Sequence, residues 1–393
     1  MFAGEDEVLQ GDLKLRYAKV QALMRECALD ALLVSTNLNN LYLSGRIFSG
    51  FTYLRVEGDP LFFVTRPVGL CGSNVYLIRK PEQIPEMLME LGKRMPECAG
   101  LEAGAVSHSS WMRLSALFPG ADLKDCTALL SAARAVKTPY EIVLMKKTGS
   151  RHAAVISQFP SVYEGGMTDQ EWMIEMVGLM LKAGSLGIFR VAGESMEAFM
   201  GTVLAGDNGG AVSPYDFAMG GAGMHPSYPV GQCGIKLERG MAVMADIAAN
   251  FYGYLTDCSR IFSIGRLPQR ALDAHRLSMD IHSAITEKGV PRASCEELYQ
   301  LALGMAVAAG FDDCFMGGAQ KSRFVGHGTG LVINEQPVLG MRSKSVLEQG
   351  MCIALEPKFY IAGVGAVGAE DTYLVGDKGL SCITQSSQEI VEL

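Results

Sequence analysis

The stretch from residue 241 to residue 265 constrains the fold of this chain more than any other. It reads MAVMADIAANFYGYLTDCSRIFSIG, two apolar runs around a turn, which predicts two antiparallel strands. If the hairpin is centred between Phe251 and Tyr252, Asp246 and Asp257 lie directly opposite each other, with Cβ atoms about 5 Å apart. Two carboxylates that close repel each other unless a proton or a cation lies between them. The pair therefore indicates a metal site, and a solvated acidic face is the alternative from these two residues alone.

Three further residues extend this set. His327 lies among three glycines in FVGHGTGL, where a backbone can approach a ligand closely. Glu356 follows the apolar run MCIAL and Glu370 follows VGAVGA, so both carboxylates lie in segments patterned for burial, where an unpaired charge is costly. With Asp246 and Asp257, the four carboxylates carry a charge of −4, which two divalent cations neutralise. Oxygen donors with one nitrogen and no sulfur favour Mn²⁺, and Co²⁺, Fe²⁺ or Zn²⁺ can also bind.

The length and patterning predict two domains. The chain has 393 residues, of which 49% are hydrophobic, enough for more than one core. The first part of the chain is predicted to form a compact α/β domain, with helices at 13–30 and 84–98 and strands at 31–34 and 61–64. The second part predicts an α+β domain, with helices at about 139–158, 168–183, 268–288 and 294–309 before glycine-rich strands from 323 onward. We place the boundary near residue 133, which gives domains 1–133 and 134–393.

Charge and cysteine content narrow the functional classes. The chain has 42 acidic and 34 basic residues, a net charge of −8, which disfavours binding to nucleic acids or anionic membranes. Apolar runs end well before the roughly 20 residues that span a bilayer, and the acidic start lacks a secretory signal. Ten scattered cysteines contain no CxxC pair, which is typical of reduced thiols. These features predict a cytoplasmic protein with no nucleic-acid or membrane partner.

The five candidate ligands, together with their local motifs, resemble a known superfamily. The 246–257 hairpin, GHGTGL, LEP and AEDT are similar to the pita-bread metallopeptidases, which include methionine aminopeptidase, aminopeptidase P and prolidase. The separations of 11, 70, 29 and 14 residues most resemble the prolidase and Xaa-Pro aminopeptidase branch. The segments DALLV and NLYLSG near the N-terminus are similar to its creatinase-type first domain. The resemblance implies an α+β pita-bread catalytic domain preceded by a smaller α/β creatinase-type domain.

The resemblance also implies a role for each ligand. It assigns Asp246 to one metal, Asp257 and Glu370 to bridging positions, and His327 and Glu356 to the other metal. A hydroxide would then lie between two metals and attack the scissile carbonyl at neutral pH. Glu356 would carry the proton.

Two further positions bear on substrate binding. His225, in GMHPSYPVG, stands where the family has a histidine that hydrogen-bonds the substrate carbonyl or its tetrahedral intermediate, and its alternative interpretation is a loop histidine held by prolines. Asn334 stands where prolidases usually have a second histidine, and we assign it to substrate binding.

Two usual arginines of the prolidases are missing. Val338 and Gly368 stand at their positions, so a dipeptide's carboxylate loses its bidentate partners unless Arg323 or Arg260 replaces them. Strict dipeptidase activity is therefore less strongly implied than metal-dependent hydrolysis itself.

We conclude from the sequence that the chain is a metal-dependent exopeptidase. It is expected to act on small peptides as an Xaa-Pro dipeptidase or Xaa-Pro aminopeptidase, and the resemblance implies a homodimer. Two alternatives remain open: a non-peptide C–N hydrolase of creatinase type, and a binding module that keeps only the fold. His275 and His282, seven residues apart on a predicted helix, are interpreted as structural surface residues.

Overall fold

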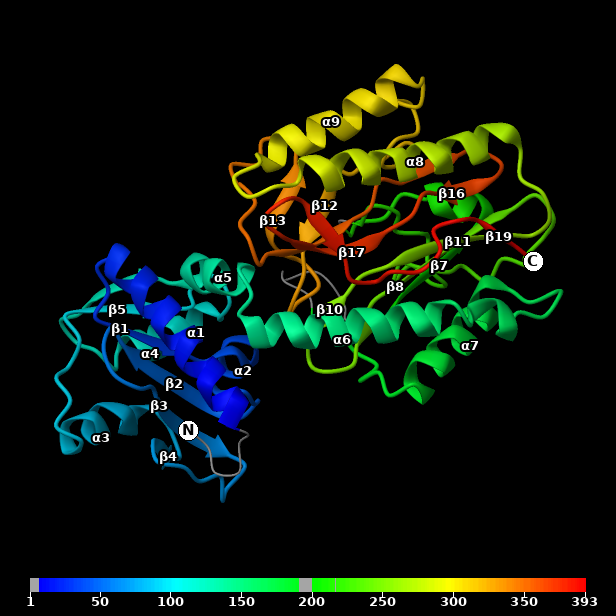
Figure 1. The fold of residues 1–393 in the computed structure, drawn as a ribbon. Coiled ribbons are helices and arrows are strands. Elements are labelled where there is room, and N and C mark those ends of the chain that lie inside the picture. Colours follow the sequence, from blue (N-terminus) through cyan, green and yellow to red (C-terminus); the bar gives the residue numbers. More distant parts are fainter. Residues whose placement is uncertain (1–6, 191–199, 216) are drawn as a thin grey trace. The chain divides into compact units, whose positions relative to one another are not determined.

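The computed structural model describes residues 7–190, 200–215 and 217–393, and the chain divides into two compact units (Figure 1). The first unit comprises Met1–Arg134 and Thr138–Tyr140, and the second comprises Ala135–Lys137 and Glu141–Leu393. Among the described helices, none is both long and apolar enough to cross a membrane.

The first unit is a mixed six-stranded sheet with helices. In sheet order, its strands are β4 (Val75–Leu77), β3 (Leu61–Arg66), β2 (Ser49–Arg55), β1 (Ala31–Val34), β5 (Cys98–Leu101) and β6 (Asp122–Asp125). The helices are α1 (Glu7–Glu26), α2 (Asn37–Ser44), the 3₁₀ helix η1 (Pro81–Gln83), α3 (Ile84–Glu90), α4 (His108–Ser115) and α5 (Thr127–Ala135). The strands predicted at 31–34 and 61–64 are confirmed as β1 and β3.

Two helix ends in this unit differ from the prediction. The helix predicted at 13–30 ends at Glu26, because Ala28 has a φ of 52°, outside the helical region, where the chain turns into β1. The helix predicted at 84–98 ends at Glu90, two residues before Gly92, whose φ is 65°. The remaining residues form a loop that leads into β5.

The second unit contains the four helices predicted from periodicity. They are α6 (Pro139–Ile156), α7 (Asp169–Lys182), α8 (Gln269–Lys288) and α9 (Cys295–Ala308), with the 3₁₀ helices η2 (Phe159–Val162) and η3 (Gly206–Gly210). Their ends follow local chemistry. Thr168 caps α7 in a capping box with Glu171, and the Ser294 side chain accepts from the Glu297 N–H at the start of α9.

Two sheets form the middle of this unit. The four-stranded sheet has the order β19 (Val391–Glu392), β11 (Ser259–Ser263), β8 (Ala242–Ile247) and β7 (Gly201–Ala205). The five-stranded sheet has the order β13 (Glu335–Gly340), β12 (Phe324–Gly328), β14 (Cys352–Leu355), β17 (Asp371–Val375) and β18 (Leu380–Cys382). Two short pairs complete it: β9 (Ala249–Asn250) with β10 (Leu255–Thr256), and β15 (Phe359–Ile361) with β16 (Gly365–Val367).

Helices cover both sides of these strands (Figure 1). Within the second unit, α8 and α9 lie on one side and α6 and α7 on the other. Apolar residues of α6 and α7 pack with β7, β8 and β11 in one buried core, in which the Trp172 ring lies 5.0 Å from that of Phe262. Residues of α8 and α9 pack with the five-stranded sheet in a second core. This is the predicted α+β arrangement, with the sheets enclosed between helices.

The register of the 241–265 hairpin corrects the prediction. Asp246 pairs with Ser259 and Asn250 pairs with Leu255, so Asp246 and Asp257 are not directly opposite each other. Each pairing partner is shifted by two residues because the turn is centred between Tyr252 and Gly253, where Gly253 has a φ of 82° and its N–H donates to Asn250 Oδ1 at 3.0 Å. Side chains alternate with a period of two, so this shift leaves both aspartates on one face, as diagonal neighbours.

Candidate metal centre

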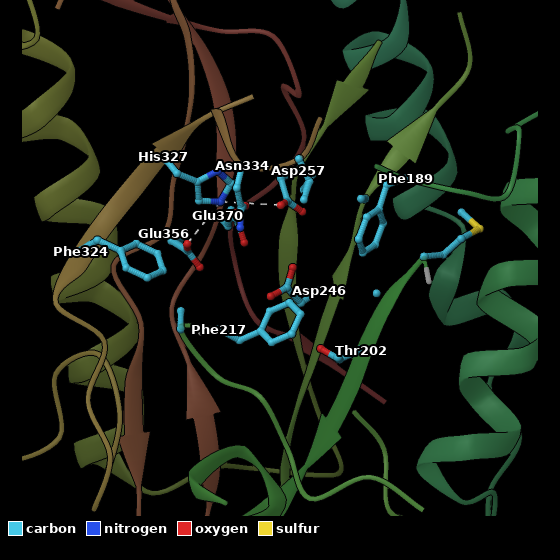
Figure 2. Close-up of a pocket in the computed structure, with 15 residues that line it drawn as sticks. Phe189, Thr202, Phe217, Asp246, Asp257, Phe324, His327, Asn334, Glu356 and Glu370 are labelled. Atoms are coloured by element: carbon cyan, nitrogen blue, oxygen red, sulfur yellow. Dashed lines mark ion pairs between the residues drawn. The ribbon is translucent and has the colours of Figure 1, made fainter. Parts of the chain in front are cut away.

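The structure brings all five predicted ligands together at one cavity of about 50 Å³ (Figure 2). Each lies on, or directly beside, a different strand of the second unit. Asp246 lies on β8 and Asp257 directly after β10, His327 lies on β12, Glu356 directly follows β14, and Glu370 directly precedes β17. The aromatic side chains Phe189, Phe217 and Phe324 line the same cavity.

His327 is oriented by its own strand. Its Nδ1 donates to the Gly328 carbonyl at 3.2 Å, which leaves the Nε2 lone pair available as a ligand. Nε2 lies 3.5 Å from Glu356 Oε1 and 3.9 Å from Asp257 Oδ2. The flanking glycines are required, because a Cβ at Gly326 would lie 2.5 Å from a backbone oxygen of β14, and one at Gly328 would lie 2.2 Å from a backbone oxygen of β13. The GHG motif therefore lets three strands meet at the imidazole.

Lys358 is the residue that the sequence analysis missed. Its side chain is 0% exposed, and its Nζ donates to Glu356 Oε2 at 2.7 Å, Asp246 Oδ2 at 2.8 Å and Glu370 Oε2 at 2.9 Å. These are the lengths of charge-assisted hydrogen bonds. The available signal was its position two residues after Glu356, because residues two apart in an extended segment share a face.

The pKa shifts reflect this crowding of charge. Burial, followed by the charges of Asp246 and Glu356, raises the pKa of Asp257 well above its usual value. Burial also raises the pKa of Glu370, although Lys358 acts in the opposite direction. For the Lys358 ammonium, burial lowers the pKa, but the surrounding carboxylates outweigh it and hold that pKa well above its usual range. The direction of this pKa shift favours the charged ammonium form of Lys358.

A further layer of hydrogen bonds positions the carboxylates. Ser259 Oγ donates to Glu370 Oε2 at 2.6 Å, and the Asp257 N–H donates to Thr372 Oγ1 at 2.8 Å. On α8, Ser278 Oγ donates to the Pro357 carbonyl at 2.6 Å and accepts from the Ala369 N–H at 3.1 Å. Ser278 thus ties together the backbones next to Glu356 and Glu370.

His275 and His282 are structural, as interpreted, but they are buried rather than on the surface. His282 Nε2 donates to the Ala369 carbonyl at 2.9 Å, and His275 Nδ1 accepts from the Gly368 N–H at 3.2 Å. Gly368 has a φ of 121°, and a Cβ there would lie 2.5 Å from the Pro357 carbonyl oxygen. The position therefore has no space for the arginine that the resemblance implies.

The donor set fits a divalent cation. Donor atoms of Asp257, His327 and Glu370 lie within 4.8 Å of one another, and so do those of a second group, Asp246, Glu356 and Glu370. Glu370 Oε1 is buried and has no hydrogen-bond partner among the described residues, which marks a place for a cation. The second group already surrounds the Lys358 ammonium.

The remaining predicted residues differ in their placement. Asn334 lines the cavity, between β12 and β13 (Figure 2). His225 is exposed, with its Nδ1 2.8 Å from Ser227 Oγ, and it is not among the described residues that line the cavity. Its role stays a prediction. Arg260 is buried in an ion pair of 2.8 Å with Asp371, and the exposed Arg323 lines a separate groove, so neither lines the cavity as a carboxylate partner.

The family comparison agrees with this geometry. Residues 143–377 match the model of metallopeptidase family M24, and residues 16–136 match the creatinase/prolidase N-terminal domain. The chain belongs to metallopeptidase family M24. As an M24 member it is a peptidase-family enzyme with a divalent-metal site, and all five residues predicted as ligands lie inside the matched catalytic region.

Individual relatives match nearly the whole length of this chain at low sequence identity. The Xaa-Pro dipeptidase of Pyrococcus furiosus is 24% identical over 387 residues, which cover 96% of this chain and 100% of that protein. Among solved structures, the Xaa-Pro dipeptidase from Bacillus anthracis has a TM-score of 0.81 at 21% identity, over 97% of this chain and 100% of that one. The X-Pro aminopeptidase from Thermotoga maritima MSB8 has a TM-score of 0.77 at 19% identity, over 95% and 100%. The structural likenesses confirm the two-domain pita-bread fold.

Proposed function

We propose that this M24 protein is a metal-dependent exopeptidase that hydrolyses the bond before proline in small peptides. The observation that carries the proposal is the convergence of Asp257, His327 and Glu370, with an orphaned buried oxygen on Glu370, at one cavity. Relatives named Xaa-Pro dipeptidase and X-Pro aminopeptidase supply the substrate class. The complete ligand set favours an enzyme over a binding module.

The oxygen-rich donor set supports Mn²⁺ as the ion, with Co²⁺, Fe²⁺ or Zn²⁺ as possible substitutes. The sequence predicts two divalent ions from a charge of −4, but that balance omits Lys358. When the ammonium is counted, the four carboxylates and Lys358 carry −3, and one divalent cation reduces this to −1. Asp257, His327 and Glu370 would hold that cation.

A bound divalent cation would supply Lewis acidity and lower the pKa of a coordinated water. The protein's own residues would do the rest. Glu356 Oε1 faces His327 at 3.5 Å and would accept a proton from the attacking water and pass it to the leaving amine. Phe189, Phe217 and Phe324 would exclude bulk water, which strengthens the electrostatic interactions in the cavity. Asn334, which lines the cavity, would hydrogen-bond the substrate.

The cavity lining bears on substrate length. Among its described residues none is Lys or Arg, so a dipeptide's C-terminal carboxylate would find no cationic partner there. We therefore propose that longer Xaa-Pro-Yaa peptides, whose carboxylate lies beyond the cavity, are cleaved better than Xaa-Pro dipeptides.

The test is an assay of Xaa-Pro dipeptides and Xaa-Pro-Yaa peptides in Mn²⁺. We expect cleavage of the longer peptides, loss of activity in Asp257→Ala, and wild-type activity in Asp313→Ala, which removes an exposed aspartate that is not among the described residues lining the cavity. Absence of cleavage of both substrate classes by Mn²⁺-loaded protein would reject the peptidase assignment. Preferential dipeptide cleavage would reject the proposed length preference.

One observation favours a second candidate, a non-peptide C–N hydrolase. The cavity of about 50 Å³ is small and partly aromatic, which suits a compact substrate. Hydrolysis of ureido or guanidino acids by Mn²⁺-loaded protein that leaves Xaa-Pro peptides intact would select this candidate.

Compartment and assembly complete the proposal. All ten cysteines are free thiols in the structure, which supports a reducing compartment such as the cytoplasm. The homodimer stays a prediction of the resemblance, and light scattering of the purified protein tests it.

A further inference from the structure

Lys358 occupies the position between Asp246, Glu356 and Glu370 that a second divalent ion would need. Its Nζ is within 2.9 Å of one oxygen from each of these carboxylates. A metal ion and an ammonium cannot both take the same three oxygens, because each is a cation at contact distance from them. The three lengths are those of charge-assisted hydrogen bonds from an ammonium.

The ammonium is built into the fold. The Lys358 carbonyl accepts from the Met316 N–H at 2.8 Å, and the preceding Pro357 carbonyl accepts from Ser278 Oγ at 2.6 Å. The side chain is fully buried, and moving it out would remove the ammonium from all three carboxylate oxygens and leave Glu370 Oε2 with Ser259 Oγ as its donor. Backbone anchors on both sides therefore direct Nζ into the carboxylate cluster.

The ammonium leaves a second set of donor atoms untouched. Glu356 Oε1 faces His327, whereas Lys358 holds Glu356 Oε2. Glu370 Oε1 has no partner among the described residues, whereas Lys358 and Ser259 share Glu370 Oε2. Asp257, which is not among the hydrogen-bond acceptors of Lys358 in the described part of the chain, forms the other group of close donors with His327 and Glu370.

We propose that Lys358 replaces one of the two cations expected at this centre, so that the protein binds a single divalent ion at Asp257, His327 and Glu370, with Glu356 Oε1 beside it. Asp246 then acts as an acceptor for the Lys358 ammonium rather than as a metal ligand. The inference rests on the proposed metal dependence and specifies how many ions that function uses.

The direct test counts metal per chain. Protein stripped with chelator is reloaded with saturating Mn²⁺, and bound metal is measured by elemental analysis and by titration calorimetry. We expect one ion per chain for the wild type and two for Lys358→Met, which keeps an unbranched chain but removes the charge. Electron paramagnetic resonance should change from an isolated Mn²⁺ signal to an exchange-coupled pair. Lys344→Met, the same change at an exposed lysine, should bind one ion.

A second variant keeps the test decisive if Lys358→Met does not fold. Asp246→Asn should still bind one ion, because Asp246 holds the ammonium in this proposal. If Asp246 were a metal ligand of a two-ion centre, the same variant would fall from two ions to one. Two ions in the wild type, or one ion in a folded Lys358→Met variant, overturns the inference.

The outcomes separate this inference from the proposed function. One ion in the wild type and two in Lys358→Met, without cleavage of Xaa-Pro peptides, retains the inference and rejects the function. Two ions in a wild type that cleaves these peptides rejects the inference and retains the function. Binding of no ion by the wild type rejects both.

Discussion

At the scale of single residues, Lys358 holds one oxygen of each carboxylate that it contacts. Glu356 shows this most clearly, with Oε2 bound to Lys358 at 2.7 Å and Oε1 3.5 Å from His327 Nε2. The Lys358 ammonium binds Glu356 Oε2, and Glu356 Oε1 faces His327. Glu356 is thereby held in place by a buried side chain.

The proposed proton carrier gives the first prediction. Glu356→Gln keeps the shape of the side chain but removes its ability to accept a proton, so kcat on Xaa-Pro-Yaa peptides should fall about 10²- to 10⁴-fold. Steady-state kinetics check this, with bound Mn²⁺ measured in parallel. Glu348→Gln, at an exposed glutamate, is the control and should retain wild-type kcat. A Glu356→Gln variant with bound Mn²⁺ and unchanged kcat would remove Glu356 from the mechanism.

A buried histidine gives a prediction of pH dependence. Burial, with a smaller contribution from Arg260, lowers the pKa of His152 from the usual value of about 6.5 to about 3. Between these two values the unfolded chain binds a proton that the folded protein does not. The free energy of unfolding should therefore fall as the pH drops through this window, by about 1.4 kcal/mol per pH unit from this group.

His152→Gln should remove that part of the slope. Urea unfolding between pH 4 and 7, followed by Trp172 fluorescence in a Trp111→Phe background, reports the second unit alone because Trp111 belongs to the first. His108→Gln, at an exposed histidine, should leave the slope unchanged. Equal slopes for His152→Gln and the wild type would mean that His152 is not buried in its neutral form.

At the scale of elements, the turns and short strands around the ligands determine how closely the sheets approach. The hairpin β15–β16 brings Lys358 and Gly368 side by side at its open end, next to the pair Phe359–Val367. Ser278 on helix α8 stabilises this ladder, because its hydroxyl donates to the Pro357 carbonyl and accepts from the Ala369 N–H. The positions of Glu356 and Glu370 therefore depend on hydrogen bonds that Ser278 makes to the backbone of the neighbouring residues.

Gly368 gives the prediction at this scale. Gly368→Ala places a Cβ 2.5 Å from the Pro357 carbonyl oxygen at a φ of 121°, so the chain must move next to both Lys358 and Glu370. We expect weaker Mn²⁺ affinity by calorimetry and a lower free energy of unfolding. Gly363→Ala, in the turn of the same hairpin at a φ of 75° with no atom within 4 Å, is the control. It should cost only the left-handed strain of about 1–2 kcal/mol and leave affinity unchanged. Equal effects of both substitutions on affinity would contradict the close-contact argument.

At the scale of the whole molecule, the metal centre belongs to one unit and should stabilise that unit alone. All five candidate ligands and Lys358 lie in the second unit, whose two cores pack around the two sheets. The first unit has its own core on its own sheet. Ligand binding to the folded state therefore raises the stability of one part of the chain.

Removal of the metal gives the prediction at this scale. An ion present at 100 times its Kd contributes about 2.7 kcal/mol to the free energy of unfolding. For a unit of this size, 1 kcal/mol corresponds to roughly 2–4 °C, so EDTA should lower the Tm of the second unit by roughly 5–11 °C. Calorimetry of the Mn²⁺-loaded protein with and without EDTA measures this, and EDTA saturated with Mn²⁺ is the control. An unchanged Tm would mean that no ion contributes to the stability of the fold.

Much of the fold and of the candidate site could be predicted from the sequence alone. The four helices of the second unit follow from periodicity and caps, because helical contacts are local in the chain. The five candidate ligands could be identified because each lies in a short apolar or glycine-rich motif. Family membership follows from those motifs and their order.

The tertiary structure alone decided the rest. It set the pairing of Asp246 with Ser259, because a change of two residues in pairing keeps the same side chains on the same face, so apolar patterning does not distinguish the two registers. It also placed Lys358 Nζ among three carboxylates from three different strands or loops. The net charge of such a site depends on which side chains meet in space. Asp246 and Lys358 are more than 100 positions apart in the chain, so only the folded structure shows that they are in contact.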